Sequence, residues 1–280
     1  MMWSNLLALD YTTCLWLSVL LVCIGVAIDT LEYLAVAPHY SNSGIYSGRI
    51  IRTRYGYKQN VAVRTMHDRL FSDSAFKFLL VLRLVFVGML FIPVGSEYYH
   101  AACIAGVLIT GFFTNYRSIY GGDGSNQMQT VVLAGVLASM LIDGASGMKM
   151  IGVWFIVLQS CLSYSASGWS KLWSRTWRSG AAVFLIFNTA TYGMRPVARF
   201  LNGKVYIQKF LSWSVIIFEV IFPLVLILPP KGALVLLLIG LTFHLGNAVI
   251  MGLNTFFWSF FATYPLVMFV NKDVRTYLFG

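Results

Sequence analysis

The sequence places ionisable side chains inside hydrophobic runs of membrane-crossing length. One run contains Tyr164, Gly168 and Lys171, and a later run contains His244 and Asn247. A Lys at the centre of a bilayer costs roughly 2.5 kcal/mol or more, so packing in lipid alone does not account for it. The chemistry that these residue types suggest is proton transfer within the membrane.

Tyr164, Gly168 and Lys171 follow one another at offsets of four and three, so they share one face of a helix. The small residues beside them allow that face to approach other helices closely. Lys171 is expected at the mouth of a helix bundle, where partial desolvation would favour its neutral amine and permit a general-base role. Alternatively, it extends from a helix end to the membrane interface, as interfacial lysines do.

His244 and Asn247 also share a helix face, and both are expected to point inward. Glu219 lies among apolar residues, so it should be neutral or paired, with Lys171, His244 or Arg83 as candidate partners. A Glu–Lys or Glu–His pair could act in catalysis or only hold helices together. No metal site is expected, because the other histidines show no ligand spacing.

The segment 115–126 has glycines on both sides of Asp123, a pattern typical of a tight turn that opens a helix. Asp123 or Ser125 is expected to cap that helix. No Gly-Lys-Ser/Thr follows, which argues against a nucleotide phosphate loop.

The composition excludes a soluble domain. Of 280 residues, 58% are hydrophobic and 11% charged, and the mean hydropathy is +0.74, which is typical of an integral membrane protein. Apolar runs cover the chain evenly, so residues 1–280 are expected to form one polytopic domain in the lipid bilayer. The cysteines should pack as small apolar residues: Cys14, Cys23, Cys103 and Cys161.

The net charge of +10 follows from membrane topology and does not indicate nucleic-acid binding. Two long connections, about 35–74 and about 171–207, carry many of the 20 Lys and Arg residues and are expected in the cytoplasm. Within the second, the short apolar segment 181–188 is expected at the interface or dipping into the bundle. If the chain crosses the membrane eight times and these connections are cytoplasmic, both termini are expected on the opposite, outer side of the membrane.

The runs predict an all-α, polytopic helix bundle with about eight transmembrane helices. The first run has Asp10 and no basic residue before it, so it is expected to be a retained helix and not a secretory signal. The expected spans are 12–34, 75–94, 98–113, 128–142, 150–170, 208–228, 232–253 and 255–270.

Three segments also occur in the order and spacing of a known family across roughly 100–270. They are Tyr120-Gly-Gly-Asp-Gly124, Gly168-Trp-Ser-Lys171-Leu172, and Phe243-His244 followed by an apolar run to Pro265. They resemble the membrane domain of vitamin K-dependent gamma-glutamyl carboxylase and its bacterial relatives, the horizontally transferred transmembrane domain group. The resemblance implies a carboxylase-like membrane fold.

It further implies that Lys171 deprotonates a membrane hydroquinone, after which oxygen addition creates a strong base for proton abstraction. His244 corresponds to a histidine of the carboxylase active-site region. Tyr116 stands where the carboxylase has the histidine that activates the lysine. Little sequence follows the last run, so the soluble domain that recognises propeptide and glutamate is not expected, nor is gamma-carboxylation of glutamate.

Small bacterial members of the group include the membrane component required to mature a secreted sporulation-delaying toxin peptide. The resemblance therefore implies peptide maturation in a bacterial cytoplasmic membrane, with a membrane quinol as cofactor and a secreted peptide and an accessory protein as partners. The alternative is a non-catalytic membrane scaffold or immunity partner. The candidate catalytic residues are Lys171, His244 and Glu219, and the candidate pocket residues are Tyr116, Asp123, Tyr164 and Asn247.

Overall fold

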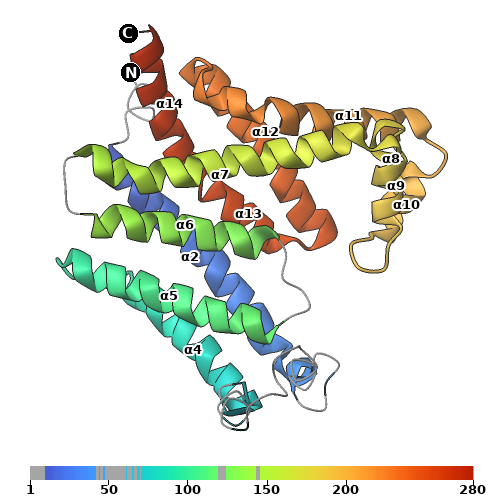
Figure 1. The fold of residues 1–280 in the computed structure, drawn as a ribbon. Coiled ribbons are helices and arrows are strands. Elements are labelled where there is room, and N and C mark those ends of the chain that lie inside the picture. The colour runs from blue at the N-terminus through green and yellow to red at the C-terminus, as the bar shows by residue number, and fades with distance from the viewer. Residues whose placement is uncertain are drawn as a thin grey trace. The chain divides into compact units, whose positions relative to one another are not determined.

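The computed structural model of the chain describes residues 10–41, 71–118, 124–142 and 146–279, together with positions 44, 47, 61, 65, 68 and 69. In these residues the regular secondary structure is helical and includes no strand (Figure 1). The all-helical prediction is confirmed for this part of the chain. Asp123 and most of the basic residues expected in the first long connection lie outside the described residues.

In the part of the chain that the structure describes, four helical segments are long and apolar enough to cross a membrane. They are α2 (Tyr11–Ala35), residues Lys149–Trp173 of α7 (Ser146–Trp173), α11 with the following 3-10 turn η3 (Val205–Leu226), and α12 (Pro230–Met251). These four segments are characteristic of a membrane protein.

Helices also form at the other predicted runs: α4 (Asp73–Met89), α5 (Glu97–Arg117) and α6 (Gly124–Leu141). The run predicted at 255–270 is divided into α13 (Asn254–Phe261) and α14 (Tyr264–Phe279). The break has a physical reason, because Pro265 has no N–H to donate to the carbonyl of Phe261. The proline instead occupies the first turn of α14, where a missing donor is tolerated.

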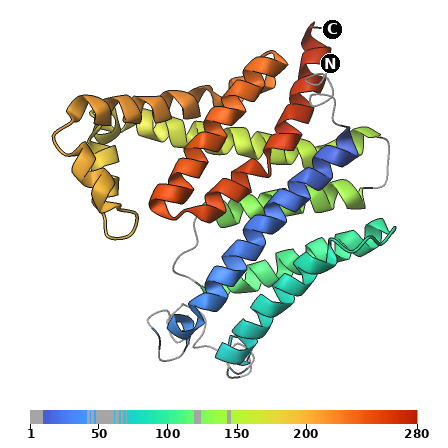
Figure 2. The same cartoon turned by 180° about the vertical axis from the view of Figure 1, so that it is seen from behind.

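The chain forms two compact units, Met1–Val22 with Val153–Gly280, and Cys23–Gly152. In the first unit, α12 packs against α13, α14 and η3 (Figure 2). Asn271 of α14 donates from Nδ2 to the carbonyl of Val225 at 2.7 Å and to that of Leu228 at 2.9 Å. These bonds satisfy carbonyls at the end of η3, where the helix supplies no donors.

The connection between α7 and α11 is itself helical. It contains α8 (Arg175–Arg178), α9 (Ala181–Phe187) and α10 (Arg195–Leu201), and all three pack against α11. Gly180 joins α8 to α9 with a φ of 88°, and a Cβ there would lie 2.5 Å from the amide nitrogen of Lys209. Only glycine fits this close, left-handed position.

In the second unit, α4 packs against α5 and α5 against α6. Serine side chains cap both of the first two helices: Ser72 accepts from the amide of Ala75, and Ser96 accepts from that of Tyr99. The four cysteines, two in each unit, are free and buried, in line with the prediction that they pack as small apolar residues.

Candidate functional site

One face of α7 carries the candidate site of the first unit. Ser160, Tyr164, Ser167, Gly168 and Lys171 follow one another at offsets of four, three, one and three, so they form a single stripe along the helix. The side chains of this stripe bond to residues of α11, α12 and α14 or the turn before α14. The common helix face predicted for Tyr164, Gly168 and Lys171 is present in the structure.

Lys171 forms an ion pair with Glu219 of α11. Its Nζ lies 2.8 Å from Oε1 and 2.7 Å from Oε2 of the carboxylate. The side chain of Glu219 is 4% exposed and that of Lys171 is 17% exposed. Ser167 completes the group, since its hydroxyl accepts from the Lys171 ammonium and donates to Glu219 Oε1 at 3.3 Å. Of the three partners predicted for Glu219, the structure selects Lys171.

Gly168 allows this pair to form, because it lies directly against the backbone of α11. A Cβ at this position would lie 2.7 Å from the amide nitrogen of Val220 and 2.9 Å from Cβ of Glu219. The missing side chain lets α7 and α11 approach closely, as small residues do in membrane helix interfaces. Lys171, one turn further along α7, can then reach the carboxylate.

A second hydrogen-bonded group lies two turns earlier on the same stripe. The hydroxyl of Tyr164 is 2.7 Å from His244 Nε2 and 2.9 Å from the hydroxyl of Tyr264. All three residues are buried. The Tyr164 hydroxyl thus joins α7 to α12 and α14.

Aromatic rings enclose this second group. The ring of Tyr164 lies 3.8 Å from that of Phe222 and 5.0 Å from that of Phe260, measured between centroids. Phe260 also stacks on His244 at 4.6 Å. Nδ1 of His244 is buried and has no hydrogen-bond partner among the described residues. An unpaired buried nitrogen is costly, which makes His244 a candidate for contact with a bound polar group.

The two groups together supply an ammonium, a carboxylate, two phenols and an imidazole along one helix stripe. Each of these can donate, accept or transfer a proton at short range. The surrounding rings keep the local environment apolar, which strengthens every electrostatic interaction within it. The arrangement is therefore suited to proton transfer with little access of water.

The remaining predicted residues are distributed differently. Asn247 lies one turn beyond His244 on α12 and is half-buried, and its carbonyl accepts from the amide of Gly252 at the end of the helix. Tyr116 belongs to the second unit, where its ring lies 4.9 Å from that of Phe71. Asp123 lies outside the described residues. Of the seven predicted site residues, Lys171, Glu219, Tyr164 and His244 make the hydrogen bonds described above.

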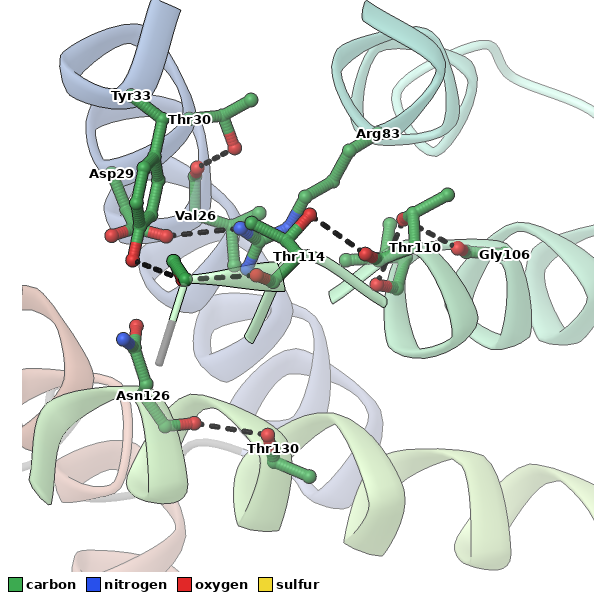
Figure 3. Close-up of polar contacts among 12 residues, drawn as sticks. Val26, Asp29, Thr30, Tyr33, Arg83, Gly106, Thr110, Thr114, Asn126 and Thr130 are labelled. Carbon is green, nitrogen blue, oxygen red and sulfur yellow. Dashed lines mark hydrogen bonds and ion pairs between the residues drawn. The ribbon is translucent and has the colours of Figure 1, made fainter. Parts of the chain in front are cut away.

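The second unit contains a separate buried ion pair that the sequence did not predict. Asp29 is 7% exposed and accepts from Arg83 Nη1 at 2.9 Å (Figure 3). The pairing links α2 to α4, and Gly111 of α5 lies close to the Arg83 guanidinium. The sequence did not indicate this pair, because the two residues are distant in the chain and nothing local marks them as partners.

Other polar groups gather around this pair. The hydroxyl of Tyr33 is 3.1 Å from that of Ser118, and Figure 3 shows Asn126 of α6 directed toward this cluster. Oδ1 of Asn126 and both amide atoms of the buried Gln129 have no hydrogen-bond partner among the described residues. The second unit therefore has a polar interior of its own.

Sequence reasoning did not single out Tyr264, although a tyrosine next to a proline inside an apolar run could have drawn attention to it. It considered Arg83 only as a partner for Glu219, whereas Arg83 pairs with Asp29. In the described part of the chain, no three His, Cys, Asp or Glu side chains gather as a metal site would need.

Comparison with known proteins adds no further constraint. No protein-family model, curated protein or solved structure matched this chain.

Proposed function

We propose that this chain is an integral membrane enzyme or peptide-maturation factor, and that Lys171 and Glu219 form its proton-transfer centre. The observation that carries the proposal is the buried ammonium–carboxylate pair, held between two helices that are apolar enough to cross a membrane. Ionisable residues inside such helices are kept at an energetic cost, and they commonly serve function.

The pair can take up one proton from a substrate. Lys171 passes a proton to Glu219, which leaves a neutral amine beside a carboxylic acid. This neutral form is accessible because a low-dielectric site disfavours separated charges. The amine then accepts the proton of a substrate O–H group, and the substrate is left as an anion beside the new ammonium.

The substrate class follows from the resemblance described above. A membrane quinol would present an acidic O–H group at the depth of the helix bundle, and a secreted peptide would be the molecule finally matured. Tyr164 and His244 would orient the substrate oxygen, since His244 retains an unpaired nitrogen. In this proposal the chain crosses a bacterial cytoplasmic membrane about eight times and has a carboxylase-like membrane domain.

A second candidate function is a non-catalytic membrane scaffold or immunity partner. One observation favours it: Lys171 contacts both carboxylate oxygens of Glu219, and α7 packs directly against the backbone of α11 at Gly168. Both features would hold the two helices together. In that case, replacing both charged residues by apolar side chains of similar volume would leave the fold intact or more stable. The variant Lys171→Met with Glu219→Met distinguishes the two functions.

The proposal is tested by thermal-shift and mass-spectrometric measurements on purified full-length protein, with and without a reduced quinone. The wild type should bind the quinol and be stabilised by it, whereas Lys171→Ala should lose both effects. Lys231→Ala, which removes an exposed lysine of α12, is the matched control and should behave as the wild type. Absence of quinol binding in all three proteins, with Lys171→Ala only less stable, would favour the scaffold.

A further inference from the structure

The connection between α7 and α11 carries a strongly basic surface. No Asp or Glu occurs in the sequence between Asp143 and Glu219. Within α8, α9, α10, their linkers and the beginning of α11, six basic residues are exposed: Arg175, Arg178, Arg195, Arg199, Lys204 and Lys209. We call these six residues the basic surface. None of them has an ion-pair partner in the described part of the chain.

This surface rests on a well-packed support. The short helices α8, α9 and α10 pack against α11, and α9 and α10 bury Ala182, Val183, Ala198 and Leu201. Gln208 of α11 donates to the carbonyl of Leu201 at 2.8 Å. Figures 1 and 2 show the three helices gathered beside the end of α7 and the beginning of α11. The helices that carry the basic residues are therefore held together in one part of the first unit.

Exposed aromatic side chains occur among the basic residues along this part of the sequence. Trp173, Phe200, Tyr206 and Phe210 are all more than half exposed. The ammonium of Lys204 lies 3.7 Å from the ring centroid of Phe200. Arginine or lysine interleaved with aromatic rings is typical of a surface at the boundary between lipid tails and headgroups.

The position of the connection agrees with this environment. The connection begins where α7 ends at Trp173 and finishes where α11 begins at Val205. Both of these helices include segments long and apolar enough to cross a membrane. The end of one span and the beginning of the next lie at the same membrane face, so the connection lies at headgroup level.

We propose that the basic surface binds the headgroups of anionic phospholipids in the membrane that α7 and α11 cross. The cationic side chains neutralise lipid phosphates, and the aromatic rings enter the upper part of the acyl region. The exposed rings argue against an acidic protein partner. In a binding surface made mainly of charged residues, these rings would stay in contact with water. A lipid surface accommodates both the charges and the rings.

The test uses full-length protein reconstituted in vesicles that contain phosphatidylcholine and phosphatidylglycerol. Energy transfer from tryptophan to pyrene-labelled lipid reports which of the two lipids lies beside the protein. The wild type should prefer labelled phosphatidylglycerol. In the triple variant Arg175→Gln, Arg199→Gln, Lys204→Gln this preference should fall by up to about a hundredfold, because each of the three basic residues near an anionic surface contributes a factor of about five.

A matched triple variant controls for loss of net charge. Lys231→Gln, Lys272→Gln and Arg275→Gln remove three positive charges of the same unit outside the basic surface, and this protein should keep the wild-type preference. An equal loss in the two variants, or an unchanged preference in the first, would overturn the proposal. Binding of polyglutamate in pure phosphatidylcholine vesicles, without any preference for phosphatidylglycerol, would also overturn it and assign the surface to a protein partner.

Salt provides a test that needs no substitution. Raising the ionic strength from about 0.01 M to about 1 M shortens the screening length from about 30 Å to about 3 Å. The preference of the wild type for phosphatidylglycerol should then largely disappear. A preference that is unchanged at high salt would contradict an electrostatic headgroup site, whatever the folding behaviour of the variants.

Discussion

Gly168 of α7 lies so close to Val220 of α11 that a Cβ would stand 2.7 Å from the backbone nitrogen of Val220. Backbone contact of this kind fixes the separation of the two helices, because backbone atoms cannot move aside as the end of a side chain can. The Lys171–Glu219 pair spans the same interface. The geometry of the candidate proton-transfer centre therefore depends on a residue that has no chemistry of its own.

Gly168→Ala should destabilise the protein by roughly 1–3 kcal/mol, because an added methyl group in a filled interface forces the backbones apart. Gly246→Ala on α12 is the control, since a Cβ there meets nothing within 4 Å. That variant should be neutral or slightly stabilised by the better helix propensity of alanine. Melting temperatures of both variants in the same detergent make the comparison. Equal melting temperatures for the two variants would mean that a methyl group added at position 168 does not force the helices apart.

Tyr164→Phe should cost roughly 1–3 kcal/mol, because it leaves buried polar atoms of His244 and Tyr264 without the shared hydroxyl. Tyr264→Phe should cost less, since the bond between Tyr164 and His244 remains. The exposed Tyr277, replaced in the same way, should change nothing measurable. Chemical or thermal denaturation in detergent gives the three values. A larger loss for Tyr264 than for Tyr164 would contradict the central position of Tyr164.

Asp29→Ala should destabilise the protein by about 3–5 kcal/mol, because the guanidinium of Arg83 would remain buried without its counter-charge. Replacing both residues by apolar ones, Asp29→Leu with Arg83→Met, should recover much of this loss. Asp273→Ala removes an exposed carboxylate and is the control. If the double variant were no more stable than Asp29→Ala, the cost would come from lost packing and not from the unpaired charge.

The sequence predicted local features well. Apolar runs located the helices, since burial in lipid or in a helix interface requires continuous hydrophobic length. Offsets of three and four placed Tyr164, Gly168 and Lys171 on one face, because helical periodicity is a local property. The division of the last run at Pro265 was missed, although a proline in that position disfavours a continuous helix.

Long-range pairing could not be predicted to the same degree. Glu219 had three candidate partners, and its choice of Lys171 depends on how closely Gly168 brings two helices together. Asp29 and Arg83 meet through packing between helices that are distant in sequence, so nothing local distinguished a buried aspartate from an interfacial one. The carboxylase-like activity stays a prediction, because contacts within the chain do not identify a substrate.

The proton-transfer proposal is tested most directly by infrared difference spectroscopy of the wild type in bilayers, recorded as a reduced quinone is added. A proton moved onto Glu219 produces a carboxylic-acid carbonyl band. We expect this band to appear in the wild type and to be absent from Glu219→Gln, which keeps the shape of the side chain but cannot be protonated in this way. A spectrum in which quinol binds without any such band, or in which Glu219→Gln gives the same band, would contradict a proton-transfer role for the Lys171–Glu219 pair.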